Sequence, residues 1–170
     1  MPNICAVVMN AARARYFALR ETDDPTVGGP ELIEKKDLAN PEATAPERGL
    51  FANLRGSNRA HAGGPEHNYD DHRTEHAEET NRRFAKTSIA EADAMMRQLQ
   101  GDTLILVANP GMLGKLRPLL QNHGDLANKV IEFAKDLSVR PTQAIHEALA
   151  AEGLLPARSD PTHTRNGRPR

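Results

Sequence analysis

Two short apolar runs most constrain how this chain can fold. Residues 4–10 read Ile-Cys-Ala-Val-Val-Met-Asn, and residues 103–108 read Thr-Leu-Ile-Leu-Val-Ala. A strand that is apolar at successive positions is buried on both faces, which is typical of the centre of a sheet covered by helices. The sequence therefore predicts an α/β domain with these two segments inside its sheet.

Two more strands follow the first at short distance. Residues 14–20 alternate as a strand, and residues 31–39 form a third strand whose charges place it at an edge. Links this short join antiparallel neighbours, so the three strands form a meander. From about His72 to Leu99 the apolar residues recur every three or four positions, which predicts one long helix that Gly101 ends.

The second half continues with alternating helices and strands. Asn109 and Pro110 are a helix cap and first helical residue after the strand at 103–108. Residues 130–137 fit either a helix or a short strand. Pro141 opens a last helix, which Gly153 caps. The order β-β-β-α-β-α-(β)-α matches the α/β ribonuclease H-like plan, a mixed sheet with helices on its faces.

Length and composition fit one such domain, residues 1–155, with a long loop at 40–71 and a disordered basic tail at 156–170. Its 22 Lys and Arg against 23 Asp and Glu exclude an overall basic field. No stretch approaches the roughly 18 apolar residues of a membrane span. Cys5 is the only cysteine, which excludes an intramolecular disulfide. We expect a bacterial-type cytoplasmic protein.

The strand ends argue against metal-dependent nuclease chemistry. A two-metal nuclease of this plan needs carboxylates after its first and fourth strands, because two divalent cations require anionic ligands. The chain has Asn10 and Asn109 at these places. Neutral amides cannot compensate the charge, so the sequence excludes this activity, and we expect no cofactor.

A second possible chemistry lies in the motif H-x-x-E-H. His72, Glu75 and His76 place two imidazoles one helical turn apart, as zinc peptidases do. The alternative is a solvated helix start whose acidic residues suit the helix dipole. His123 and His146 have no evident partner and are expected at the surface.

The long loop holds the remaining candidates. Gly63 and Gly64, with Glu66 and His67 beside them, would let a backbone approach a partner closely. The candidate phosphate contacts in and after the loop are Arg55, Arg59, Arg73, Arg82 and Arg83. A plain surface loop is an equally good interpretation.

Four segments together resemble a known family. They are residues 6–17, 83–86, 104–117 and 135–137, and in order and spacing they resemble the bacterial host attachment protein family over most of residues 4–155. Members of that family often have Asp where this chain has Asn10.

That family is similar to the middle domain of archaeal and eukaryotic class-1 peptide release factors. The resemblance implies a ribonuclease H-like five-stranded sheet with a strand at 130–133. It also implies that Gly63 and Gly64 occupy the place of the release-factor GGQ loop. Pro65 stands where the glutamine would be and has no amide hydrogen, so peptide release by the usual mechanism is not expected.

The main expectation is therefore a non-catalytic or weakly catalytic binding module of the translation machinery. It would act in rescue or hibernation and contact the ribosome or tRNA through the loop. The first alternative is an interaction protein concerned with attachment to a host or a surface. The second is a small metal-dependent hydrolase that uses His72, Glu75 and His76.

Overall fold

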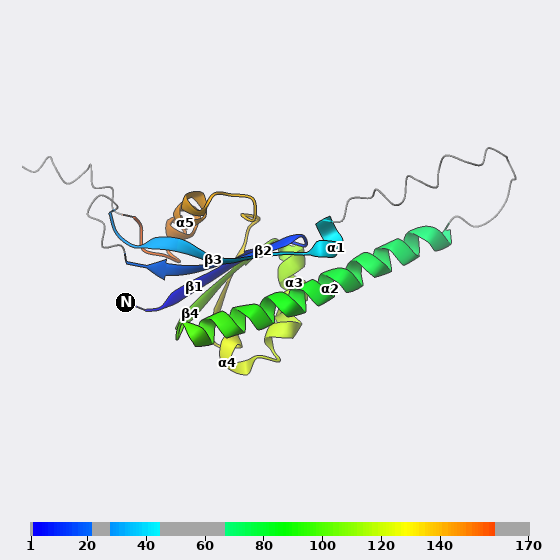
Figure 1. Ribbon diagram of the computed structural model, residues 1–170, viewed down its shortest axis with the longest axis horizontal. Helices are drawn as coiled ribbons and strands as arrows, with labels where there is room; N and C mark the ends of the chain where they lie inside the picture. Colours follow the sequence, from blue (N-terminus) through cyan, green and yellow to red (C-terminus); the bar gives the residue numbers. More distant parts are fainter. Residues whose placement is uncertain (1, 22–27, 45–66, 159–170) are drawn as a thin grey trace, which may run out of the picture.

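The computed structural model describes residues 2–21, 28–44 and 67–158, and for residue 44 and residues 67–74 it describes the backbone alone. Five strands form one mixed sheet in the order β3-β2-β1-β4-β5 (Figure 1). They are β1 (Ile4–Met9), β2 (Arg13–Arg20), β3 (Glu31–Ala39), β4 (Thr103–Ala108) and β5 (Val130–Ala134).

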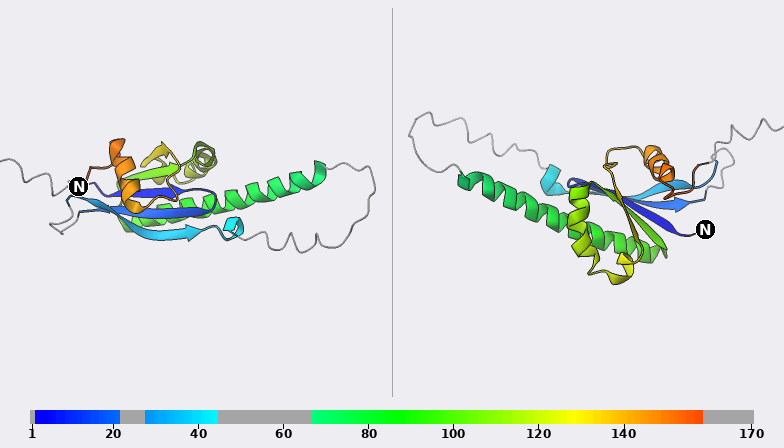
Figure 2. Two further views of the ribbon diagram at one scale, coloured as in Figure 1. Left: turned by 90° about the horizontal axis from the view of Figure 1, so that it is seen from above. Right: turned by 180° about the vertical axis from the view of Figure 1, so that it is seen from behind.

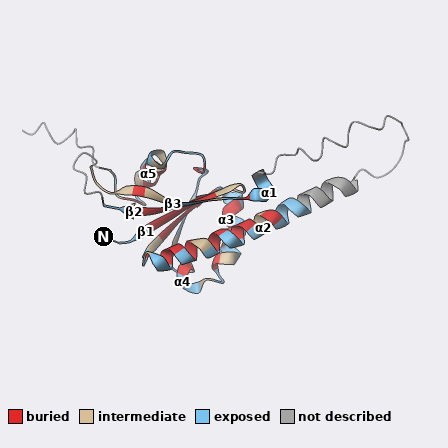
Figure 3. Cartoon of the chain, in the orientation of Figure 1, coloured by how far each residue is buried: buried red, intermediate tan, exposed pale blue. Residues whose placement is uncertain are grey.

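The strand pairing confirms the predicted meander. β1 pairs antiparallel with β2, and β2 with β3, whereas β4 runs parallel to both β1 and β5. The two apolar runs lie side by side at the centre, where residues 5–9 and 104–108 are buried (Figure 3). The segment that fitted either a helix or a strand is a strand, β5, at one edge of the sheet.

Helices cover both faces of the sheet (Figures 1 and 2). They are α1 (Pro41–Thr44), α2 (His67–Gln98), α3 (Pro110–Leu120), α4 (Gly124–Ala127) and α5 (Thr142–Ala151). Residues of α2, α3 and α4 form one apolar cluster with one face of the sheet, and residues of α5 form a second cluster with the other face. Val7 and Val8 lie in different clusters because successive side chains of a strand point to opposite faces.

The long helix α2 begins earlier than predicted. Its backbone is helical from His67 rather than from about His72, and its first turns extend past the sheet (Figure 1). Both α1 and these turns lie within the range expected to be loop; the rest of that loop, residues 45–66, lies outside the described residues.

The predicted helix ends are confirmed. Gly101 follows α2 and donates from its backbone N to the carbonyl of Met96 at 2.7 Å. A Cβ at Gly101 would lie 2.4 Å from the sulfur of Met96, so a side chain there would require the end of the Met96 side chain to move. Asn109 caps α3 by accepting from the backbone N of Met112 at 2.8 Å, and Gly153 adopts a φ of 71° after α5.

Candidate functional site

The carboxyl ends of the parallel strands form the first candidate site, because ligands of open α/β sheets bind there. Val8 pairs with Val107, so Asn10 and Asn109 follow their strands at the same edge of the sheet. The segment after β5 contributes Asp136 and Ser138 at this edge. We call Asn10, Arg15, Asp136 and Ser138 the strand-end network.

The side chain of Asn10 makes three hydrogen bonds within the fold. Its Oδ1 accepts from the backbone N of Ala12 at 2.8 Å and of Arg13 at 2.9 Å. Its Nδ2 donates to Oγ of Ser138 at 2.9 Å, and that hydroxyl donates to Oδ1 of Asp136 at 2.6 Å. A carboxylate could accept the first two bonds but could not donate the third. Asn10 therefore has a structural task.

Arg15 is fixed in the same region and is only 6% exposed. Its Nε and Nη2 bind the carboxylate of Glu34 at 2.9 and 2.6 Å. Its Nη1 donates to the carbonyl of Arg140 at 2.6 Å, and the guanidinium lies 5.0 Å from the ring centre of Phe17. These contacts join β2, β3 and the segment before α5. The guanidinium of Arg15 is therefore bound within the fold.

Where the structure describes side chains of the histidine motif on α2, they form no group that would hold a metal. His76 is exposed, and its Nε2 lies 4.0 Å from Oε2 of Glu42; Glu75 is also exposed, and the side chain of His72 lies outside the described part of the chain. Within the described residues, no three His, Cys, Asp or Glu side chains are placed to bind a metal ion together. The metal role stays a prediction.

The basic residues of α2 are interleaved with carboxylates. Nη1 of Arg82 lies 4.0 Å from Oε2 of Glu79, and Arg83 lies 3.7 Å from Glu42 and 3.8 Å from Glu79. Glu42 also accepts from the hydroxyl of Thr80 at 2.5 Å, which ties α1 to α2.

The other predicted contacts cannot be placed as side chains. Gly63, Gly64, Glu66, Arg55 and Arg59 lie outside the described residues. His67 and Arg73 are described by backbone alone, as part of α2. The roles proposed for all of them stay predictions.

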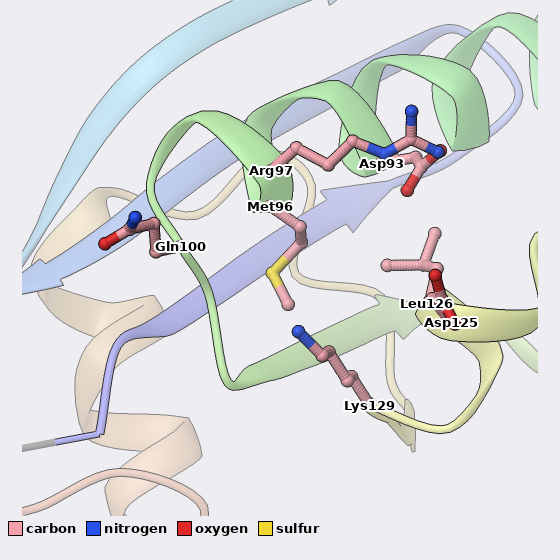
Figure 4. Close-up of a pocket in the computed structure, with 7 residues that line it drawn as sticks. All are labelled: Asp93, Met96, Arg97, Gln100, Asp125, Leu126 and Lys129. Atoms are coloured by element: carbon pink, nitrogen blue, oxygen red, sulfur yellow. The ribbon is translucent and has the colours of Figure 1, made fainter.

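Sequence reasoning missed a pocket of about 170 Å³ between the end of α2 and α4 (Figure 4). Oδ2 of Asp93 accepts from Nη2 of Arg97 at 2.6 Å and lies 3.1 Å from Nδ1 of His123. Lys129 donates to the carbonyl of Gly101 at 2.8 Å. His123 is thus partly buried against Asp93, thirty residues away, and no local pattern could have predicted the pairing.

The expectation that His146 lies at the surface is wrong. The residue is 1% exposed, and its Nε2 donates to the carbonyl of Pro156 at 2.9 Å. The error arises because the segment after α5 folds back over this helix and brings Leu155 into the same apolar cluster as Ile145.

Burial also removes two potential nucleophiles. It raises the pKa of the Cys5 thiol to about 11, because the anion would be poorly solvated in the core. The pKa of Tyr16 rises to about 12 for the same reason, and its hydroxyl donates to the carbonyl of Ser88 at 3.2 Å. Both groups are therefore protonated near neutral pH and serve the packing of the core.

A family model described as "Protein required for attachment to host cells" matches residues 5–149. The chain belongs to this family. The matched range includes all of the sheet except its first residue and nearly all of α5, so the host attachment family is defined over the whole folded unit. No curated protein gives a significant match.

The family corrects the main expectation from the sequence. The description of the host attachment family names attachment to host cells, which contradicts a binding module of the translation machinery and supports the first alternative. The expectation failed because it assigned the role of release factors on the basis of a similar fold, and one fold serves many functions. The expected ribosome or tRNA partner rested on that role. Among the described residues, no helix is long and apolar enough to span a membrane.

Proposed function

We propose that this chain is an interaction protein that supports attachment to host cells or surfaces. The observation that carries the proposal is the family match over residues 5–149, whose description names this process. Because the match spans both faces of the sheet, the proposal concerns the domain as a whole.

The strand-end network supports a binding role over a catalytic one. At the edge where α/β enzymes place reacting groups, Asn10 and Asn109 are used in a turn and in a helix cap, and the carboxylate of Asp136 accepts from the hydroxyl of Ser138. The one cationic side chain of the network, Arg15, is bound to Glu34. No observation favours the metal-dependent hydrolase.

We infer that the domain follows the ribonuclease H-like plan. The strand order β3-β2-β1-β4-β5, with β2 alone antiparallel to its neighbours, supports this inference. The similarity to the middle domain of release factors would then be one of fold, and it carries no function with it.

We further propose that the protein acts in the cytoplasm and affects attachment through a partner. A domain whose single cysteine is buried and unpaired suits a reducing compartment, whereas small secreted domains commonly rely on disulfides.

The test is deletion of the gene in the cell that encodes it, followed by counting of cells attached to a host-cell monolayer. We expect a several-fold loss of attachment that the wild-type gene restores. Unchanged attachment would overturn the proposed function. Fractionation of the same cells tests the location: recovery of the protein outside the cell would overturn the cytoplasmic, indirect mode.

A further inference from the structure

The two edges of the sheet differ in how well they are protected against pairing with another strand. The middle of β3 carries four consecutive charged residues, and the pairing of β2 with β3 is interrupted by a register shift at Tyr16 and Phe17. Charges and bulges are the means by which proteins block strand addition at an edge. The charged residues are Glu34, Lys35, Lys36 and Asp37.

β5 is less protected: it has one charged side chain, Glu132, which Arg117 binds, and its lysines lie only beyond its two ends. Its sequence, Val-Ile-Glu-Phe-Ala, contains no proline or lysine, and its pairing with β4 continues without a register shift. Ile131 is 43% exposed, and no residue of the strand is fully buried. Among the described residues, no strand pairs with the outer side of β5.

The backbone of β5 offers its free hydrogen-bonding groups in a defined pattern. The backbone N of Leu104 donates to the carbonyl of Lys129 at 2.9 Å, so this carbonyl, which precedes Val130, faces β4. Because these groups alternate along a strand, Val130, Glu132 and Ala134 direct their N–H and C=O groups away from the sheet.

The charges beside β5 are positive at both ends and neutralised in the middle. Lys129 and Lys135 flank the strand, and neither has a carboxylate partner among the described residues. The ammonium of Lys135 lies 5.8 Å from the ring centre of Phe133. Glu132 is bound by Arg117, whose Nη2 lies 2.7 Å from Oε2.

We propose that the edge of β5 docks an extended segment of a partner protein, which adds to the sheet as a further strand. Ile131, Phe133 and Lys135 lie on one face, so the segment presents apolar side chains to Ile131 and Phe133 and an acidic side chain to Lys135. The ammonium of Lys129 is directed away from this face, toward the carbonyl of Gly101. The inference rests on the proposed function as an interaction protein, for which it specifies the surface and the chemistry of the partner.

The same charges disfavour a second copy of this chain as the occupant. The antiparallel register that pairs all five residues of β5 with a second β5 places Glu132 opposite Glu132 and gives Lys135 no carboxylate partner, because the residue opposite it is Lys129. Like charges directly opposite each other destabilise strand pairing. An acidic segment meets no such repulsion.

The test uses the full chain and the peptide acetyl-Glu-Thr-Val-Thr-Val-Thr-Glu-amide, whose glutamate at each end places an acidic side chain opposite Lys135 in either strand direction. The control peptide has lysine at both ends. We expect the acidic peptide to bind at least about tenfold more tightly, and to slow hydrogen exchange at the amides of Val130, Glu132 and Ala134. Equal binding of both peptides, or no binding, would overturn the proposal.

Two variants separate the hydrogen bonds of the edge from its side chains. Glu132→Pro removes an outward N–H, whereas Glu132→Ala keeps it, and both lose the ion pair with Arg117. We expect only Glu132→Pro to weaken peptide binding, by about tenfold or more, while both variants keep the circular dichroism of the wild type. In Lys135→Glu, the preference should reverse toward the lysine peptide. Equal binding to Glu132→Pro and Glu132→Ala, or formation of a dimer through β5 in sedimentation experiments, would contradict the proposal.

The proposed function can fail independently of this inference. If the peptide binds as expected but cells carrying Glu132→Pro attach as well as cells carrying Glu132→Ala, the docking edge is real and attachment does not use it. If deletion of the gene abolishes attachment but the peptides do not bind, the proposed function stands and the docking edge is refuted.

Discussion

The side-chain amide of Asn10 donates a 2.9 Å hydrogen bond to the hydroxyl of Ser138, 128 positions later in the chain. The bond joins the end of β1 to the segment that connects β5 with α5. The same amide accepts two backbone bonds in the turn between β1 and β2. The residue at the end of the first strand is therefore both a donor and an acceptor, a combination that aspartate lacks above its pKa.

Asn10→Asp should lower the free energy of unfolding by about 1–2 kcal/mol near neutral pH, because the donor to Ser138 is lost and a second carboxylate is placed near Asp136. Urea unfolding followed by circular dichroism measures the change. Ser138→Ala, which removes only the partner hydroxyl, is the control. A variant as stable as the wild type would show that the bond to Ser138 contributes nothing.

Replacement of Arg15 should be among the most damaging polar changes. Arg15→Met leaves the carboxylate of Glu34 and the carbonyl of Arg140 without their donor, and we expect a loss of about 2–3 kcal/mol. Arg15→Lys should recover little, because an ammonium cannot form the two-pronged contact. Chemical denaturation of both variants checks this, and full recovery with lysine would refute the geometric argument.

The ion pair of Arg13 and Asp37 should make stability depend on pH in the acid range. The hydrogen bond from Arg13 holds the pKa of Asp37 below its ordinary value. Its contribution is therefore present above the ordinary aspartate range and is lost as the pH falls through the lowered pKa. Both side chains are 43% exposed, so we expect at most about 1 kcal/mol.

Unfolding of Asp37→Asn beside the wild type, at a series of pH values, measures this contribution. The two proteins should differ near neutral pH and converge in acid. A difference that persists unchanged into strong acid would exclude the ion pair as its cause.

Tyr16 should make the fold sensitive to alkali. Burial raises its pKa to about 12 from an ordinary value of 10.0, so the stabilisation is complete below the ordinary pKa and is lost as the pH rises toward about 12. Tyr16→Phe should lose about 1 kcal/mol at neutral pH with the bond to Ser88, and should then show a shallower alkaline decline. Denaturation across the alkaline range compares the two proteins. Parallel pH profiles would contradict the assignment to Tyr16.

The central part of the fold could be predicted because its signals are local. The apolar runs of β1 and β4 need no distant residue to be recognised, and Asn109 and Pro110 cap a helix by contacts within one turn. β5 was ambiguous because an edge strand is buried on neither face and its pattern also fits a helix. The start of α2 was misplaced because its first turns lack an apolar period.

The candidate sites were less predictable because they join distant segments. Nothing near Asn10 indicates Ser138, and nothing near His123 indicates Asp93. The burial of His146 depends on a segment that returns over α5, so the solvated position that its own helix suggested was wrong. Function was misjudged for a related reason: a likeness of fold was allowed to stand for a likeness of role.

The position of β1 has a mechanical consequence. This strand comes first along the described chain yet lies in the middle of the sheet, with β2 bonded on one side and β4 on the other. A pull on the chain ahead of Ile4, directed along the strand, loads both ladders in shear, so their bonds must yield together rather than one after another. A pull on β5 across the sheet would instead open its single ladder from one end. The force needed to unfold the domain should therefore be higher when the chain is pulled at β1 than when it is pulled at β5.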